Sequence, residues 1–451
     1  MVRNIVKAAF VMSVFVVILA GVIFRAEAYG EKCSKEPGEI CDPLNMKYYT
    51  CDDEKFCQNG MTIKPGSPLA DLKKCDKGSL FLCEQGMNAV NGIWKPEYTE
   101  TALDLLKYAH RERDGEWVWR IGSPEIAITL FGLLGDKANA KAVEDLINTN
   151  EKLDGFVKNL KPEIFDSLWW MGNKESASVM AKAIENKNYT GTHRAKGLRI
   201  LREWSSKDAV PWCQTTLRDE SDSDVVQACV EYLGWMKVAE ALPMIQRLID
   251  TYEGSAANAI GWLGDPKNKA ILTARLEKYK PFQYTYRIPI LGGLVNLGDA
   301  KAWQELLGFL NEKNYDAIGQ AAVEMELITH PQYKTKVVAE LTKAAKVHWA
   351  GKDNKLGGVY AAASLARLGS NAGGQVLKAA LNDPKDEFRE LAISLISTTY
   401  ADYMGNPRRG LGSAKDPSLV PVLKEFIAME RKEEFRILAV KAIAEIKARG
   451  K

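Results

Sequence analysis

The sequence predicts an all-α protein in which helix pairs stack into a solenoid behind a small cysteine-rich module. Three observations support this fold class: a helix–turn–helix pattern recurs along most of the chain, six cysteines crowd into its early part, and the chain opens on a short apolar segment. The expected parts are a signal peptide at 1–28, a disulfide-rich module at 29–90 and the solenoid at 95–451.

The opening segment has the layout of an export signal. Arg3 and Lys7 precede an apolar run over 9–24, and small residues fit a cleavage site just before Tyr29. The run is short for a membrane span, so we expect the segment to be cleaved, with a retained N-terminal anchor as the alternative. Cleavage predicts a periplasmic or secreted protein without a membrane span.

The early cysteines predict a module held together by disulfides. The six lie close together, interleaved with Gly, Pro, Asp and Lys: Cys33, Cys41, Cys51, Cys57, Cys75 and Cys83. A metal site is the alternative, but no C-x2-C pair is present and no histidine is near. Six cysteines allow fifteen pairings, and the sequence does not choose among them.

Two further cysteines lie within the repeats. Cys213 and Cys229 belong to two helical stretches that are separated by the turn 219–224. If those stretches are antiparallel, the two residues lie nearly level, which is the arrangement that a disulfide needs. Two buried thiols are the alternative, and an oxidising compartment favours the disulfide.

The repeat consists of an apolar helical stretch, a short turn and a second helical stretch. Clear copies cover 128–147, 167–184, 230–249, 258–276, 292–310 and 362–381, and weaker ones cover 197–217 and 323–341. In the aligned copies the turn position recurs at a spacing of roughly thirty residues. It is occupied by Gly135, Gly172, Ser205, Lys237, Gly264, Gly298, Thr329 and Gly369. One helix pair cannot bury its apolar face alone, so neighbouring copies must stack.

The turn residues follow from the chemistry of helix ends. Glycine accepts the left-handed conformation that ends a helix, and a following Asp or Asn can cap the next helix. In 258–272 these residues are Gly264 and Asp265, and Pro266 suits the first turn of the next helix. The segment 433–451 is expected to form a last helix whose charged outer face caps the array.

The stretch AANAIGWLGD, residues 256–265, resembles HEAT repeats, and most of all the HEAT-like subclass named after phycobilisome lyases. The resemblance covers 95–451 and implies a right-handed α-solenoid. It also implies a protein-binding scaffold, since most members are scaffolds and a minority attach chromophores or bind other ligands. The chain departs from the family in its cysteine-rich head and in inserts at 282–289, 352–360 and 402–417. The last insert is either a functional loop or a passive one.

Three tryptophans share one position of the repeat, two residues before the turn: Trp170, Trp235 and Trp262. Equivalent positions in a solenoid form a row, so these rings could grip an extended polypeptide or a glycan by stacking. The alternative is that each ring packs in the groove between its own repeat and the next. The unit between Trp170 and Trp235 interrupts the row, which favours packing.

No catalytic or cofactor-binding constellation is evident. The four histidines share no ligand spacing, and the motifs H-E-x-x-H and G-x-S-x-G and the phosphate-binding Gly-rich loop do not occur. The sequence therefore predicts no cofactor, no metal and no catalytic residue. The formal net charge is +3 and no long basic run is present, so nucleic acid is not an expected partner.

The favoured function is an exported, non-catalytic scaffold that binds a protein or another component of the cell envelope. The alternative is a glycan-binding or glycan-acting helical enzyme that uses the Trp row as a platform. A chromophore-modifying enzyme fits less well, because that branch of the family works inside the cell. A purely structural surface protein anchored by the cysteine-rich head is a third reading.

Overall fold

A computed structural model describes residues 50–52, 55–58, 61–63, 89, 99, 103, 110–113, 116–119, 123–135, 137–150, 161–187, 189–351, 354–397 and 414–449. The chain divides into two compact units, one made of 1–80 and 94–127 and the other of 81–93 and 128–451. The predicted signal peptide lies outside the described residues, and so do the pairings of the six early cysteines.

The first unit contains short antiparallel strands. β1 (Thr50–Asp52), β2 (Lys55–Gln58) and β3 (Met61–Ile63) form a sheet in that order, within the predicted disulfide module. β4 (His110–Arg113) pairs with β5 (Glu116–Trp119). This hairpin lies inside the segment that we expected to be helical from residue 95, so the described helical repeats begin only after it.

The rest of the described chain is helical, as the repeat predicts, and forms an α-solenoid. Its α-helices are α5 (Ser123–Leu134), α6 (Ala140–Asn150), α7 (Lys161–Met171), α8 (Ala177–Glu185), α9 (Gly191–Glu203), α10 (Val210–Asp219), α11 (Ser223–Trp235), α12 (Leu242–Arg247), α13 (Glu253–Leu263), α14 (Lys269–Leu276), α15 (Tyr284–Asn296), α16 (Ala300–Leu310), α17 (Tyr315–Glu326), α18 (Pro331–Ala350), α19 (Lys355–Arg367), α20 (Gly374–Leu381), α21 (Asp386–Ile396), α23 (Leu419–Met429) and α24 (Glu433–Arg449). Among the described residues, no helix is long and apolar enough to cross a membrane.

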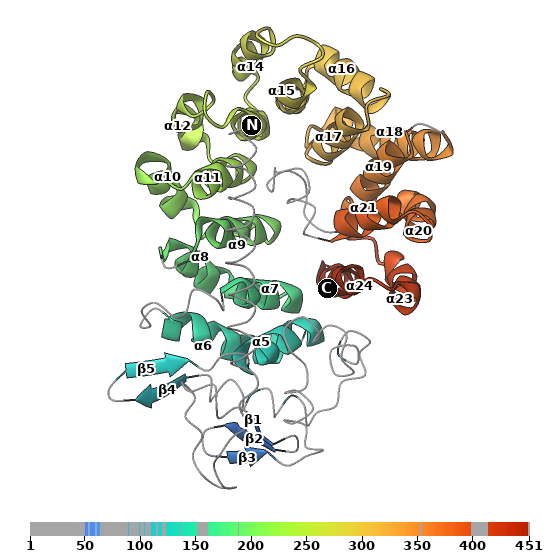
Figure 1. Ribbon diagram of the computed structural model, residues 1–451. Helices are drawn as coiled ribbons and strands as arrows, with labels where there is room; N and C mark the ends of the chain where they lie inside the picture. The colour runs from blue at the N-terminus through green and yellow to red at the C-terminus, as the bar shows by residue number, and fades with distance from the viewer. Residues whose placement is uncertain are drawn as a thin grey trace, which may run out of the picture. The chain divides into compact units, whose positions relative to one another are not determined.

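The helices form two layers, and the inner layer closes on itself. The inner helices, α7, α9, α11, α13, α15, α17, α19, α21 and α24, each contact the next in the series, and α24 also contacts α7 (Figure 1). The other helix of each pair lies outside this layer (Figure 1). The second unit is therefore a closed ring of repeats rather than an open solenoid with two free ends.

The expectation that the last helix caps an open array is wrong. α24 packs against both α21 and α7, and its Glu445 is only 1% exposed. The helix is flanked on two sides because the accumulated turn of the repeats brings it back to the first inner helix. Its charged residues therefore include buried ones, where a cap would carry a solvated face.

The predicted turn positions adopt the left-handed conformation. Seven of the eight have positive φ: Gly135, Gly172, Ser205, Lys237, Gly264, Gly298 and Gly369. Ser205 and Lys237 are the only non-glycine residues with positive φ in the described chain, at 56° and 57°. At Lys237 the amide of the next residue, Val238, donates 3.0 Å to the carbonyl of Leu233, which is the hydrogen bond of a Schellman motif. The helix end therefore imposes this conformation even where the residue is not glycine.

Polar residues after the turns cap the outer helices. The Asp265 side chain accepts a hydrogen bond from the amide of Lys267, and Asp299 accepts from the amides of Lys301 and Ala302. Each carboxylate satisfies backbone donors that the first turn of a helix leaves open.

The insert expected at 282–289 is mostly helical. α15 begins at Tyr284 and contains Pro289 in its second turn, where the missing N–H removes the helical hydrogen bond to the Thr285 carbonyl. The insert at 402–417 is described only from residue 414. There the amide of Ala414 donates to Ile396 over 3.0 Å and the amide of Lys415 donates to Ala366 over 2.8 Å, which ties this end of the insert to α21 and α19.

Replacing Lys237 by glycine should stabilise the protein. A non-glycine residue in the left-handed region carries strain of about 1 kcal/mol, and Lys237→Gly removes it at an exposed site. We expect a rise of about 0.5–1 kcal/mol in the free energy of unfolding, measured by chemical denaturation. The matched control is Lys334→Gly at an exposed position inside α18, which should lower that free energy by about 1 kcal/mol. Equal effects of the two changes would contradict the strain at Lys237.

Candidate functional site

The carboxyl ends of the inner helices carry buried charges that meet inside the ring. We call this set the polar belt; it comprises Arg202, Glu203, Glu231, Glu326, Arg367 and Arg449. Arginines suit this place because the carboxyl end of a helix carries partial negative charge. Glutamates from neighbouring inner helices then balance them.

The most deeply buried pair of the belt joins α17 to α19. Arg367 and Glu326 are 2% and 3% exposed. Arg367 Nε and Nη2 donate to Glu326 Oε1 over 2.9 and 2.7 Å, and Nη1 donates to the Leu395 carbonyl of α21 over 2.7 Å. One guanidinium therefore ties three inner helices together, and its hydrogen bonds offset the cost of burying the charge.

A second pair joins α9 to α11. Arg202 Nη1 lies 3.6 Å from Glu231 Oε2, and its guanidinium lies 5.4 Å from the centre of the Trp235 ring. Glu231 Oε1 accepts a hydrogen bond of 2.7 Å from the Ser255 hydroxyl of α13. The contacts again extend over three successive inner helices.

The third pair closes the ring. Arg449, in the last turn of α24, forms an ion pair with Glu203 at the end of α9 and lies 5.0 Å from the centre of the Trp169 ring of α7. Gly172 helps α24 to approach, because a Cβ there would lie 3.3 Å from the Ala448 carbonyl oxygen. Burial lowers the pKa of the Arg449 guanidinium, which remains charged at any physiological pH.

Lys415 adds an ammonium beside the belt. It lies near the end of the insert at 402–417, and its charge interacts with Arg449, Glu203, Arg202 and Glu326. Burial, together with the Arg449 guanidinium, lowers the pKa of Lys415. No hydrogen bond or ion pair joins its ammonium to a described residue. The belt glutamates nearest to it are already engaged by Arg449 and Arg367.

Two of the three predicted Trp rings are buried between repeats. Trp170 and Trp262 are 5% and 2% exposed, and Trp235 is half-buried. Trp262 Nε1 donates 2.9 Å to the Leu327 carbonyl, and its ring meets the Trp235 ring edge to face at 5.1 Å. These contacts correspond to the packing alternative and leave no row of exposed rings.

The polar belt was missed from the sequence, although two of its members, Glu203 and Arg367, occupy the repeat position of the tryptophans. Two residues before the turn, other copies carry Glu203, Asn296 and Arg367. Asn296 Nδ2 donates 3.2 Å to the same Leu327 carbonyl that Trp262 binds. The available signal was that polar residues replace Trp at this one position in several copies.

Cys213 on α10 and Cys229 on α11 are paired as a disulfide in the structure. Both are fully buried, and their Cα atoms lie 5.2 Å apart. The pair joins the outer and inner helices of successive repeats across the capped turn that begins α11, where Asp222 accepts from the amides of Asp224 and Val225.

The two most exposed aromatic side chains among the described residues, Phe282 and Tyr286, lie where α14 turns into α15. We call Tyr279, Phe282 and Tyr286 the aromatic patch. Phe282 is 73% and Tyr286 51% exposed, and the rings of Tyr279 and Tyr286 stack at 5.0 Å with 7° between their planes. Sequence reasoning marked 282–289 only as an insert, since exposure of a ring is not visible in the repeat pattern.

A hydrogen bond and ion pairs beneath the patch hold the Tyr279 ring in place, on which Tyr286 stacks. Tyr279 Oη donates 2.6 Å to Glu253 Oε2, and Arg275 pairs with Glu253 and Asp250. Burial and this hydrogen bond raise the pKa of Tyr279 to about 12. Arg287 pairs with Glu305 and donates to the Leu276 carbonyl over 3.2 Å.

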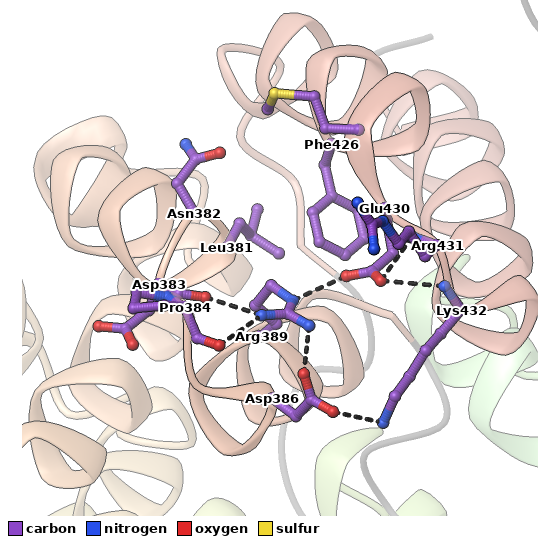
Figure 2. A pocket seen from close by; sticks show the side chains of 11 residues that line it. Leu381, Asn382, Asp383, Pro384, Asp386, Arg389, Phe426, Glu430, Arg431 and Lys432 are labelled. Carbon is purple, nitrogen blue, oxygen red and sulfur yellow. Dashed lines mark hydrogen bonds and ion pairs between the residues drawn. The ribbon is translucent and has the colours of Figure 1, made fainter.

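A groove of about 540 Å³ lies where the α20–α21 corner faces the α23–α24 corner (Figure 2). Its floor includes Leu381 and Phe426, and Arg389 stands in its centre (Figure 2). Arg389 donates 2.8 Å to Glu430 Oε2 and also pairs with Asp386. Although burial acts in the opposite direction, the amide of Lys432 and the Arg389 guanidinium together lower the pKa of Glu430. The charges of the groove therefore neutralise one another and join two repeats.

No group of three or more His, Cys, Asp or Glu side chains in the described part of the chain could hold a metal ion. His348 Nε2 lies 2.9 Å from the Leu310 carbonyl in the interior, where it joins α18 to α16.

Removing Arg367 should destabilise the ring strongly. Arg367→Met takes the guanidinium away from a buried carboxylate, and such a change costs about 3–5 kcal/mol. The double variant Arg367→Met/Glu326→Met removes both charges and should recover more than half of that loss in thermal unfolding. If the double variant is as unstable as the single one, the pair does not act as a unit.

The bond between Cys213 and Cys229 should be found in the protein purified without reductant. Peptide mapping without reductant should recover the two cysteine peptides as one species. The bond closes a loop of 16 residues, so Cys213→Ala/Cys229→Ala should lower the free energy of unfolding by about 3 kcal/mol. Recovery of both peptides as free thiols would contradict the pairing.

Comparisons with known proteins agree with the repeat. Residues 177–255, which run from α8 into α13, match the model of the HEAT repeat family. No curated protein matches the chain. Solved structures that match include human deoxyhypusine hydroxylase in complex with glycerol, at 15% identity and a TM-score of 0.27, covering 57% of this chain and 96% of that chain. A likeness at that level says nothing about function. The match over 177–255, together with the stacked helix pairs, supports a HEAT-like repeat fold.

Proposed function

We propose that this protein is an exported, non-catalytic HEAT-like scaffold that binds a protein partner through the aromatic patch. The observation that carries the proposal is the exposure of Phe282, at 73%, beside the stacked Tyr279 and Tyr286. The export signal at 1–28 and the disulfide-rich head support the extracytoplasmic setting.

The patch has the properties of a binding hot spot. Large aromatic side chains contribute much of the energy of protein interfaces, and they do so best when they are held rigidly before binding. The Glu253 and Arg275 contacts fix the tyrosine at the base of the patch. A partner that covers Tyr286 would thus bury an ordered ring at little cost in side-chain entropy, and Phe282 would add further apolar area.

The charged groups of the interior fit a structural role. The arginines of the polar belt and of the groove are engaged with carboxylates and carbonyls of other repeats. Such contacts hold the repeats in register, which a scaffold needs in order to present a fixed surface. The glycan alternative required exposed tryptophans, and the packing of Trp170 and Trp262 removes the observation that favoured it.

A photo-crosslinking experiment tests the proposal. A photoreactive phenylalanine analogue in place of Phe282 should capture a defined protein in the producing cells. The matched control places the same group at Met429, which is 62% exposed on another repeat, and should capture little.

The variant Phe282→Ala/Tyr286→Ala should weaken binding of the captured partner about a hundredfold, measured by titration calorimetry. The patch is exposed, so thermal unfolding should change little. Full binding of the partner by this variant would show that the aromatic patch is not the binding site. A glycan array that binds the wild type but not the variant would replace the protein partner with a carbohydrate.

A further inference from the structure

One outer helix differs from the others in length and charge. α18 spans Pro331–Ala350, 20 residues, and is the longest helix in the described chain. It lies on the outer side of α19, to which it presents an apolar face that includes Val337, Leu341 and His348 (Figure 1). Its other side has no described element against it along most of its length.

The outward side of α18 carries a concentration of unpaired positive charge. We call Lys336, Lys343 and Lys346 the lysine face; all three are exposed and lie within about 80° of one another around the helix. Lys334 is also exposed, but it lies about 200° around the helix from Lys336, on the opposite flank. No side chain of these four lysines forms an ion pair or a hydrogen bond with a described residue, and Lys336 only lies 5.8 Å from the Tyr333 ring. Glu340 is the only acidic residue of the helix.

This charge is local and is not a property of the whole molecule. The complete chain has a formal net charge of +3, whereas α18 alone carries four lysines against one glutamate. Elsewhere on the described surface, lysines on helices do form ion pairs, as Lys378 does with Glu425 and Lys196 with Asp166. The lysine face therefore creates a positive potential on one side of the ring.

The geometry of the face suits a broad anionic surface. At 1.5 Å per residue, Lys336 and Lys346 stand about 15 Å apart along the helix. The residues between the lysines on this side are small, such as Thr335 and Ala339, so no large apolar anchor or pocket marks the centre. Val338 and Val347, which are 38% and 57% exposed, border the face on its two edges.

We propose that the lysine face of α18 docks the protein on a membrane surface that contains anionic phospholipids. Lysine is a compact, mobile charge that pairs with fluid headgroup phosphates without a fixed geometry. Each basic residue near an anionic membrane surface adds to the binding affinity. Small side chains between the basic residues let the helix lie flat on the membrane. This surface is separate from the aromatic patch and does not depend on the proposed protein partner.

Vesicle sedimentation tests the proposal with the exported chain as recovered from the producing cell. Vesicles of phosphatidylcholine and phosphatidylglycerol at about 60:40 should bind the protein in 50 mM salt. Pure phosphatidylcholine vesicles should bind it at least about thirtyfold more weakly. Raising the salt to about 500 mM should remove the difference, since the attraction is screened.

Charge-matched variants identify the surface. Lys336→Gln/Lys343→Gln/Lys346→Gln should weaken binding to the anionic vesicles about a hundredfold. The control Lys267→Gln/Lys278→Gln/Lys301→Gln changes the net charge equally at exposed sites elsewhere and should weaken it less than threefold. All variants share the same N-terminus, so differences among them report on α18. Equal effects of the two variants, or equal binding to neutral and anionic vesicles, would overturn the proposal. The proposal would also be overturned if the protein bound polyglutamate but did not bind anionic vesicles, because the face would then bind an acidic protein.

Discussion

The contact between α24 and α7 is the constraint on which the rest of the ring depends. Once α24 returns to the first inner helix, every inner helix has a neighbour on each side and an outer helix behind it. In α13 the residues from Ser255 to Trp262 are consequently all buried. Such crowding needs small residues at the crossings: a Cβ on Gly261 would lie only 2.7 Å from the Cα of Gly293 in α15.

Closure also explains why charge is buried at the carboxyl ends of the inner helices. In an open solenoid these ends would face solvent, which satisfies their carbonyl groups. In the ring they meet one another, and guanidinium groups supply the donors that water would otherwise provide. Arg367 shows this directly, since one of its nitrogens binds the Leu395 carbonyl while the others bind Glu326. Each arginine is matched to particular neighbours, so the pairs also specify which helix lies beside which.

The fold could be predicted from the sequence to the extent that it depends on local pattern. The helix pairs and the left-handed turn positions follow from residues a few places apart, and the alignment found Ser205 and Lys237 even though neither is glycine. The match over 177–255 supports the same repeat. Closure escaped prediction because it depends on small rotations summed over all repeats. Glu203 lies near the start of the ring and Arg449 at its end, so no local pattern in the sequence indicates that they pair.

Exposure escaped prediction for a related reason. Trp262 and Phe282 are both large aromatics near a turn, but one is 2% and the other 73% exposed. Burial depends on what a neighbouring repeat places against the ring, and the single repeat does not contain that information. The repeat pattern therefore suggests the tryptophans as ligand-binding residues, whereas it shows the aromatic patch only as part of an insert.

A closed array also changes what the two ends of the repeat region mean. A linear solenoid unfolds from its terminal repeats, which have one neighbour each and open most easily. In this ring α7 and α24 support one another, so the weakest place is not set by position in the chain. No inner helix is therefore first or last in space. A circularly permuted chain that began at another inter-repeat turn would still contain every interface of the ring.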